Sequence, residues 1–260
     1  MGCYCTIVPE GFMIISINSI HFSVRNRPEN DPEAPALVFA WLENKLNEAK
    51  VKDLKVILTY HLPHGLFLTP IGVEKYWVHN YEESLKLLLD RYSSIISGIY
   101  TGHMHLSTFN VSQLNDTKEY YAGVLVNRAL SPIFGNNPGF ALYYYIDSME
   151  HPKYFEEYTF TINKTYNRTD SAKNYWIHLY NSYTDLGIEN LSSVGISKFI
   201  NTTESNLRKH LNYMVLRLGI NFADYQAIDG VIKKICKGHT IDTSTYVMCV
   251  DSLNEYIKDN

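Results

Sequence analysis

The stretch IISGIYTGHMH, residues 95–105, joins an apolar run directly to a glycine and two histidines. A continuous apolar run of this length is typical of a strand that is buried on both faces of a parallel sheet. A second run, LKVILTY at 54–60, ends in HLPHG at 61–65, and a third, GFMIISI, covers 11–17. We therefore predict three buried strands, two of which lead straight into loops that carry histidines.

Helical patterns separate these strands. Apolar residues recur at helical spacing from 36 to 49, after an entry at 31–35 in which Asp31 would be the cap and Pro32 would lie just inside. A second helix is predicted over 81–91, and the mixed stretch 66–79 is predicted to be a loop. The order strand, helix, strand, helix, strand predicts an α/β core.

The chain changes character after residue 147. Before that point, strands are expected near 108–113, 120–127 and 140–146, with a last strand at 155–163. From residue 171 onward helical patterns dominate, and they cover 171–185, 195–217, 223–236 and 245–258. We place a boundary near 165, with a larger domain over 1–165 and a small helical domain over 166–260.

Composition excludes two classes of partner. The net charge is −4, the hydrophobic share is 45%, and the sequence contains no basic stripe, so binding to a nucleic-acid backbone is not expected. The sequence also contains no run of eighteen apolar residues, which predicts that no helix crosses a membrane.

The sequons favour a glycosylated protein in an oxidising compartment, secreted or lysosomal. They begin at Asn110, Asn115, Asn163, Asn167, Asn190 and Asn201. Cys236 and Cys249 could close a short loop as a disulfide or remain two buried thiols. The first residues do not show the pattern of a secretory leader, so we expect a longer protein whose leader lies upstream.

Three histidines are the candidate ligands of a metal. His61, His103 and His105 each follow the end of a predicted buried strand, where α/β proteins place their sites. Neutral imidazole is a good zinc ligand, and Gly102 would let the backbone turn sharply as it leaves the strand. The alternative is that all three are ordinary loop residues. The loops of His21 and His64 could face the same cleft.

Four ordered segments resemble motifs of the acid sphingomyelinase branch of the calcineurin-like metallophosphoesterases. They are DPEAPALVFAWLENKLNEA at 31–49, VILTYHLPHG at 56–65, RYSSIISGIYTGHMH at 91–105 and ALSPIFGNNPGF at 129–140. Residues 154–200 are similar to the start of the helical C-terminal domain of that family, and Cys236 and Cys249 are spaced like a disulfide near its C-terminus. His64 departs from the family, which has a second proline there.

The resemblance implies a β-sandwich core with flanking helices and a site with two zinc ions that hydrolyses a phosphodiester. By position, His61 and His103 would ligate one zinc and His105 the other, while residues 137–140 would form a structural turn beside the cleft. The implied substrate is sphingomyelin or a related choline phosphodiester, with transient contact to a membrane surface; nucleotide phosphodiesters are the alternative.

The upstream half of the family pattern is absent from this sequence. We find no Asp-x-His, Gly-Asp-x-x-Asp or Gly-Asn-His-Glu motif, and these carry further metal ligands and the acid that protonates the leaving group. No catalytic acid can therefore be assigned. We expect the chain to be the C-terminal part of a phosphodiesterase and to be inactive alone.

Two other hypotheses remain open. The chain could be a non-catalytic pseudoenzyme or binding glycoprotein that keeps a vestigial histidine cluster. Alternatively, Met1-Gly2-Cys3-Tyr4-Cys5-Thr6 fits a myristoylation pattern with nearby palmitoylation sites, which would anchor a cytoplasmic protein to a membrane. We predict that this match is a coincidence, because the same stretch also resembles a strand pair in the middle of the family's domain.

Overall fold

The computed structural model describes most of the chain. The described residues are 2–26, 32–69, 72–111, 123–134, 136–146, 151–160, 176–204, 206–218 and 250–255. Cys236, Cys249 and the predicted helix at 223–236 lie outside them, as do Asn115, Asn163 and Asn167.

A six-stranded sheet forms the centre of the molecule, in the order β1-β2-β3-β6-β8-β7. The strands are β1 (Tyr4–Val8), β2 (Phe12–Ser16), β3 (Lys55–Thr59), β6 (Ile96–Thr101), β7 (Thr108–Asn110) and β8 (Val124–Val126). β2, β3, β6 and β8 are parallel, whereas β1 and β7 pair antiparallel at the two edges. The three predicted buried strands are therefore neighbours in one sheet, and the predicted α/β class is confirmed.

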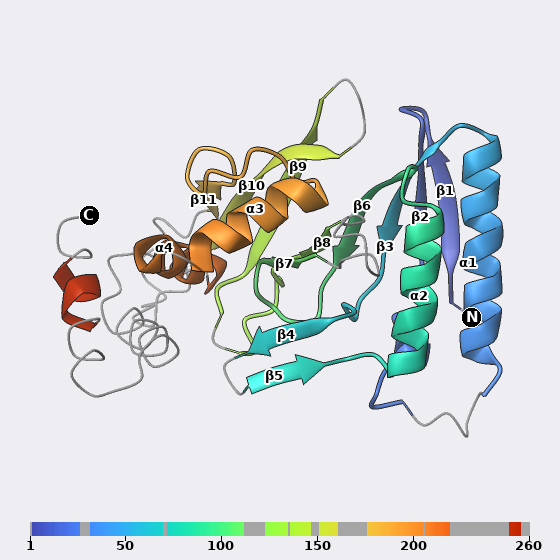
Figure 1. The fold of residues 1–260 in the computed structure, drawn as a ribbon, viewed down its shortest axis with the longest axis horizontal. Helices are drawn as coiled ribbons and strands as arrows, with labels where there is room; N and C mark the ends of the chain where they lie inside the picture. The colour runs from blue at the N-terminus through green and yellow to red at the C-terminus, as the bar shows by residue number, and fades with distance from the viewer. Residues whose placement is uncertain are drawn as a thin grey trace, which may run out of the picture.

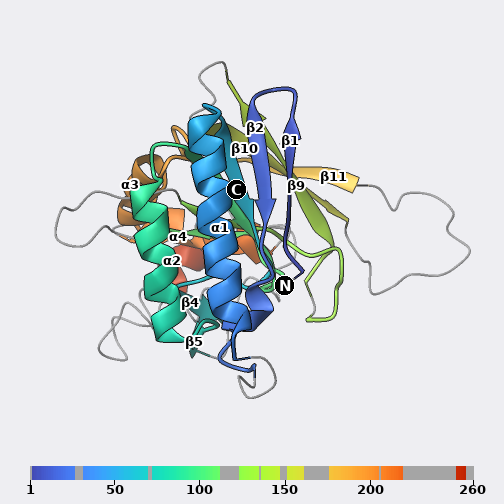
Figure 2. The same cartoon turned by 90° about the vertical axis from the view of Figure 1, so that its right-hand side faces the viewer.

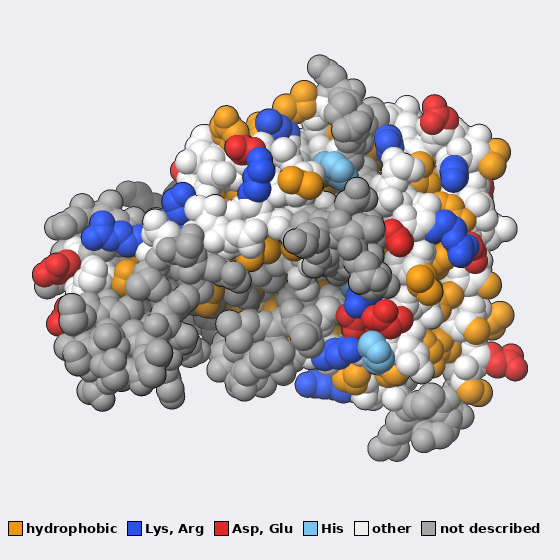
Figure 3. Space-filling model, in the orientation of Figure 1, with side chains coloured by type: hydrophobic (Ala, Val, Ile, Leu, Met, Phe, Trp, Pro, Cys, Tyr) orange, Lys and Arg blue, Asp and Glu red, His pale blue; other side chains and the backbone are white. Residues whose placement is uncertain are grey.

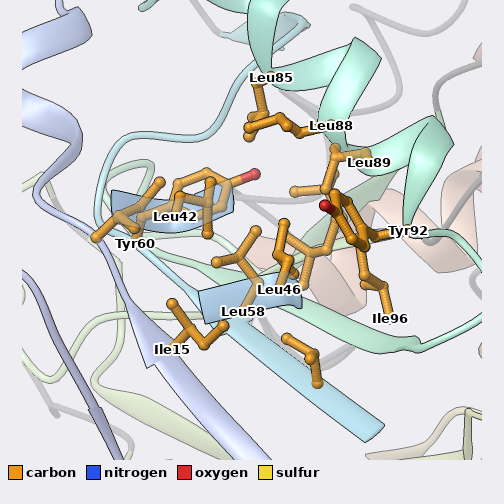
Figure 4. Close-up of a cluster of buried hydrophobic side chains, with 14 of the residues drawn as sticks. Ile15, Leu42, Leu46, Leu58, Tyr60, Leu85, Leu88, Leu89, Tyr92 and Ile96 are labelled. Carbon is orange, nitrogen blue, oxygen red and sulfur yellow. The ribbon is translucent and has the colours of Figure 1, made fainter. Parts of the chain in front are cut away.

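Two helices cover one face of this sheet (Figure 2). They are α1 (Ala34–Val51) and α2 (His79–Arg91). In α1 the fully buried residues Val38, Leu42 and Leu46 recur every four positions, which places them on one helical stripe. Figure 4 shows Leu42 and Leu46 beside Leu58 of β3, in the same cluster as Leu85, Leu88 and Leu89 of α2. This face of the sheet is thus closed by an aliphatic core.

A second, three-stranded sheet lies on the other side, in the order β11-β10-β9 (Figure 1). Its strands are β9 (Gly139–Tyr145), β10 (Pro152–Phe160) and β11 (Trp176–Asn181), all antiparallel. Leu125 of β8 faces this sheet, while its neighbours Val124 and Val126 face the helices. The central sheet is therefore buried on both faces, between two helices and a second sheet, as the resemblance implied.

The C-terminal part packs against a second hydrophobic cluster, on the side of the central sheet that faces β9, β10 and β11. Helix α3 (Ser193–Glu204) and helix α4 (Leu207–Leu218) occupy the predicted helical region 195–217, and residues 250–255 are also helical. Ile196 and Phe199 of α3 are buried beside Phe109 and Phe155. No described helix has the length and hydropathy that a membrane span requires.

Three local predictions were wrong. The stretch 66–79 is not a loop, because it contains the hairpin of β4 (Leu66–Thr69) and β5 (Gly72–Lys75). Part of the predicted helix at 171–185 is the strand β11, which pairs with β10. Helix α1 begins at Ala34 with Glu33 as its N-cap, so the proline in its first turn is Pro35 and not Pro32. β11 lies beyond the predicted domain boundary near 165; the division into two domains stays a prediction.

Candidate metal centre

His61 and His103 lie side by side at the carboxyl ends of two neighbouring strands. β3 and β6 are parallel and adjacent, so the residues that follow them meet at one edge of the sheet. Nε2 of His61 is 3.2 Å from Nδ1 of His103, and the rings meet edge to face. The amide of Gly102 donates to the carbonyl of His61 at 3.0 Å. The structure thus brings these two predicted residues together, and their role as metal ligands stays a prediction.

The distance between these nitrogens fits two ligand positions of zinc. Zinc–nitrogen bonds of about 2.0–2.1 Å in a tetrahedral site place two ligating nitrogens roughly 3.3 Å apart. The same 3.2 Å also suits a hydrogen bond between the two rings when one nitrogen carries a proton. The distance therefore suits both a metal held by two histidines and a hydrogen bond between the two rings.

His105 forms no three-residue metal-binding group with this pair. Its ring meets Phe134 edge to face, with centroids 4.8 Å apart, and its Nδ1 is buried without a hydrogen-bond partner. Across the part of the chain that the structure describes, no group of three or more His, Cys, Asp or Glu side chains is arranged to hold a metal ion. The described residues thus supply two ligand positions, and a third ligand is lacking among them.

The loop that carries His103 and His105 has an uncommon backbone. Both residues have positive φ, 70° and 58°, in the left-handed region that side chains other than glycine adopt at a cost of about 1–2 kcal/mol. Gly102 does not have positive φ, and a Cβ there would make only ordinary contacts. The prediction that Gly102 provides the sharp turn was therefore wrong, because the turn falls on the histidines themselves.

Asn127 holds the start of this loop. Its amide donates to the carbonyl of Thr101 at 2.8 Å, and its side-chain Nδ2 donates to the same oxygen at 3.2 Å. Its Oδ1 in turn accepts from the hydroxyl of Tyr143 on β9 at 2.8 Å. Sequence reasoning missed Asn127, since an asparagine at the end of a strand carries no distinctive pattern.

The second histidine of HLPHG is a core residue. His64 is almost fully buried, with Nδ1 2.6 Å from the hydroxyl of Tyr60 and its ring edge-on to Trp77. Burial lowers the pKa of His64 from 6.5 to about 4, although the charge of Glu82 opposes the shift. His64 is therefore neutral at physiological pH and belongs to the packing beneath the loop.

The turn Asn136-Asn137-Pro138-Gly139 leads into β9 of the second sheet. The carbonyl of Pro138 accepts from the amide of Phe160 and from the hydroxyl of Thr159, both at 2.9 Å. A Cβ on Gly139 would lie 2.0 Å from Cδ of Arg128, so only glycine fits under that side chain. These contacts tie the turn to β10 and to Arg128, while its place beside a substrate cleft stays a prediction.

Three of the six sequons fall on described residues. Asn201 is exposed on α3, Asn110 is half-buried in β7, and Asn190 uses its side-chain oxygen to accept from the amide of Ser192 at 3.1 Å. Glycosylation at all six positions stays a prediction, as does the disulfide between Cys236 and Cys249.

Lys and Arg side chains are interspersed with Asp and Glu on the face drawn in Figure 3.

Several curated phosphodiesterases resemble this chain. "Sphingomyelinase phosphodiesterase D" of Dictyostelium discoideum is 28% identical over 148 residues, 55% of this chain and 33% of that protein. A cyclic GMP-AMP phosphodiesterase of Homo sapiens is 27% identical over 260 residues, 95% of this chain and 55% of that protein. "Sphingomyelin phosphodiesterase 1" of Caenorhabditis elegans is 25% identical over 224 residues, 82% and 37% respectively.

The chain matches no protein-family model. It spans from about a third to about half of the length of these three relatives.

Proposed function

We propose that this chain, which is related to the acid sphingomyelinase-like branch of the metallophosphoesterases, takes part in the hydrolysis of a phosphodiester bond. The observation that carries the proposal is the pair of His61 and His103 at the carboxyl ends of β3 and β6. The relatives named as phosphodiesterases support the reaction class.

The cofactor we propose is zinc, two ions in the complete site. Bound zinc would act as a Lewis acid towards the phosphoryl oxygens and would activate a water molecule. Nε2 of His61 and Nδ1 of His103 would hold one ion, and His105 would hold the other. The described residues contain no group of three or more side chains arranged to hold a metal ion. The motifs that carry the remaining ligands and the leaving-group acid in the resembling family are absent from this sequence, so we assign no catalytic acid.

The substrate we propose is sphingomyelin or a related choline phosphodiester, reached by transient contact with a membrane surface. A nucleotide phosphodiester is the alternative, because one relative is named for cyclic GMP-AMP. The product separates the two: a choline phosphodiester would release phosphocholine, whereas a nucleotide diester would release a nucleoside monophosphate.

The decisive experiment supplies zinc and both substrates to the complete protein that contains this chain, and to its His103→Ala variant, because the chain is expected to be inactive alone. The matched control is His79→Ala, which removes an exposed histidine at the start of α2. Turnover that is lost in His103→Ala and kept in His79→Ala supports the proposal. Turnover that is equal in all three proteins would contradict the assignment of His103.

A non-catalytic binding glycoprotein is the second candidate, favoured by the lack of a third ligand among the described residues. It predicts substoichiometric zinc by titration and no turnover of a generic diester. Both candidates are proposed to be secreted or lysosomal. A mass decrease on treatment with a glycan-removing amidase would support that compartment, whereas a myristoyl mass at Gly2 would contradict it.

The structure offers one observation against acylation. Cys3 and Cys5 are half-buried and pack against the aliphatic core, and Sγ of Cys3 accepts from the amide of Asn18 at 3.4 Å. A palmitoylated cysteine needs an exposed side chain that can reach a membrane.

A further inference from the structure

A buried ion pair lies between the central sheet and the second sheet. Nε of Arg128, just after β8, donates to Oε1 of Glu157 in β10 at 2.6 Å, and both side chains are essentially inaccessible. Two charges are expensive to bury, and their attraction offsets the desolvation only when the geometry is good and further hydrogen bonds are made. The further hydrogen bonds of Arg128 and Glu157 therefore show which segments of the chain the ion pair connects.

The other oxygen of Glu157 reaches the histidine loop. Oε2 accepts from Oγ of Ser107 at 2.9 Å, and Ser107 follows His105 by two residues. The hydroxyl of Tyr180 donates to the same Oγ at 3.4 Å. Arg128 also donates from Nη2 to the carbonyl of Leu216 in α4 at 2.9 Å. The pair thus ties the end of the histidine loop to the second sheet and to α4.

The ring of His105 is not fixed by a hydrogen bond of its Nδ1, which is buried and unpaired. Its position therefore depends on its contact with Phe134 and on the backbone of the loop, which has left-handed φ at His103 and at His105. The start of the loop is held by Asn127 on Thr101, and its end is held by Glu157 on Ser107.

We propose that Arg128 and Glu157 are positioning residues, which act through Ser107 to hold residues 103–107 in the conformation that presents His103 and His105. The purpose of this arrangement rests on the proposed function, in which the two histidines bind metal. The arrangement itself does not depend on a metal being bound.

The competing explanation is that the pair only stabilises the fold. Replacing a buried ion pair by apolar residues of similar volume is often neutral or stabilising. The double variant Arg128→Met/Glu157→Leu therefore separates the explanations, because it keeps the packing and removes the acceptor of Ser107. The matched control is Arg91→Met/Glu43→Leu, which replaces an Arg–Glu pair exposed between α2 and α1.

The experiment compares the wild-type chain with both double variants by thermal unfolding, by NMR of the histidine ring nitrogens without metal, and by zinc titration. We expect the Arg128/Glu157 variant to unfold cooperatively near the wild-type temperature while the ring signals of His103 and His105 shift. Its dissociation constant for zinc should rise by roughly 10- to 100-fold, the usual effect of losing a group that orients metal ligands. The control should change neither the ring signals of His103 and His105 nor the dissociation constant for zinc.

Ring signals and zinc affinity equal to wild type in a folded Arg128/Glu157 variant would overturn the proposal. If that variant does not fold, Ser107→Ala decides the question, because it leaves the ion pair intact and removes the link to the loop, together with the long hydrogen bond from Tyr180. Shifted signals of His103 and His105 in Ser107→Ala support the proposal, and unchanged signals overturn it. If the wild type binds no zinc, the metal assignment fails, but the metal-free NMR comparison still decides whether the pair positions the loop.

Discussion

The two faces of the central sheet are packed with different chemistry. On the helix side, the residues in contact are mainly aliphatic, such as Leu46 of α1 and Leu58 of β3, both with no exposed surface. On the other side, the core contains aromatic side chains and tyrosine hydroxyls, together with the buried pair of Arg128 and Glu157. Burial raises the pKa of Tyr143 well above its usual value, so its hydroxyl remains a neutral donor to Asn127.

This difference separates stability from positioning. Apolar burial is non-directional, and it rewards any arrangement that removes surface from water. Hydrogen bonds and ion pairs require particular atoms at particular distances. The polar side of the sheet is the side that holds both ends of the histidine loop, through Asn127 and through Glu157. Substitutions on the aliphatic side and on the polar side should therefore change the stability of the fold by different amounts and for different reasons. Four predictions test this difference.

The largest effect is expected from breaking the ion pair on one side only. Glu157→Leu leaves Arg128 charged, buried and without its partner, which should reduce the free energy of unfolding by about 3–5 kcal/mol. Urea denaturation monitored by circular dichroism measures this loss. Adding Arg128→Met should restore most of it; a double variant as unstable as the single one would contradict this explanation.

A cavity in the aliphatic core should have the next largest effect. Leu46→Ala removes a side chain with no exposed surface, and we expect a loss of about 2–5 kcal/mol in the free energy of unfolding. Leu37→Ala in the same helix is the control, since Leu37 is 51% exposed and should cost about 0.5 kcal/mol or less. Equal losses at the two positions would show that α1 packs through a different face.

Acid should weaken the fold through His64. The pKa of His64 is about 4 in the folded chain and near 6.5 when exposed, so between these values only the unfolded chain binds the proton. Stability is therefore greatest above pH 6.5 and falls as the pH decreases to 4, by about 3 kcal/mol from this residue. The loss measured in urea between pH 7 and pH 4 should be smaller by that amount in His64→Gln. An equal loss in both proteins would show that His64 does not cause it.

The smallest effect is expected from a single hydroxyl on the polar side. Tyr100→Phe removes one partner of the 2.6 Å hydrogen bond between Tyr100 and Tyr145, which should cost about 1 kcal/mol. Thermal unfolding by calorimetry detects a change of this size. The same substitution at Tyr183, an exposed residue in a turn, should leave the unfolding temperature nearly unchanged. A larger change at Tyr183 than at Tyr100 would argue against the polar core as described.

Short-range patterns were sufficient for part of the fold and part of the site. The apolar runs predicted β2, β3 and β6 and placed His61 and His103 in the loops that follow two of them. The structure adds that β3 and β6 are parallel neighbours, which brings the two histidines together. The hairpin of β4 and β5 was missed, since its stretch mixes polar, apolar, Pro and Gly residues without clear alternation. β11 was predicted as helix because its strand conformation depends on pairing with β10. The residues of β10 are too far away along the chain to enter a prediction from local sequence.

By itself, the sequence determined the α/β order, the buried strands, the two histidine loops and the resemblance to one branch of the metallophosphoesterases. Those features depend on residues that are close along the chain, where periodicity and motif spacing carry the information. Only the tertiary structure decided that the ring of His105 packs against Phe134 and forms no three-residue metal-binding group with His61 and His103, and that Arg128, Glu157 and Ser107 meet. Contacts between residues some 20 to 50 positions apart depend on how the two sheets pack. The charge of a single side chain does not identify the residue with which it forms an ion pair.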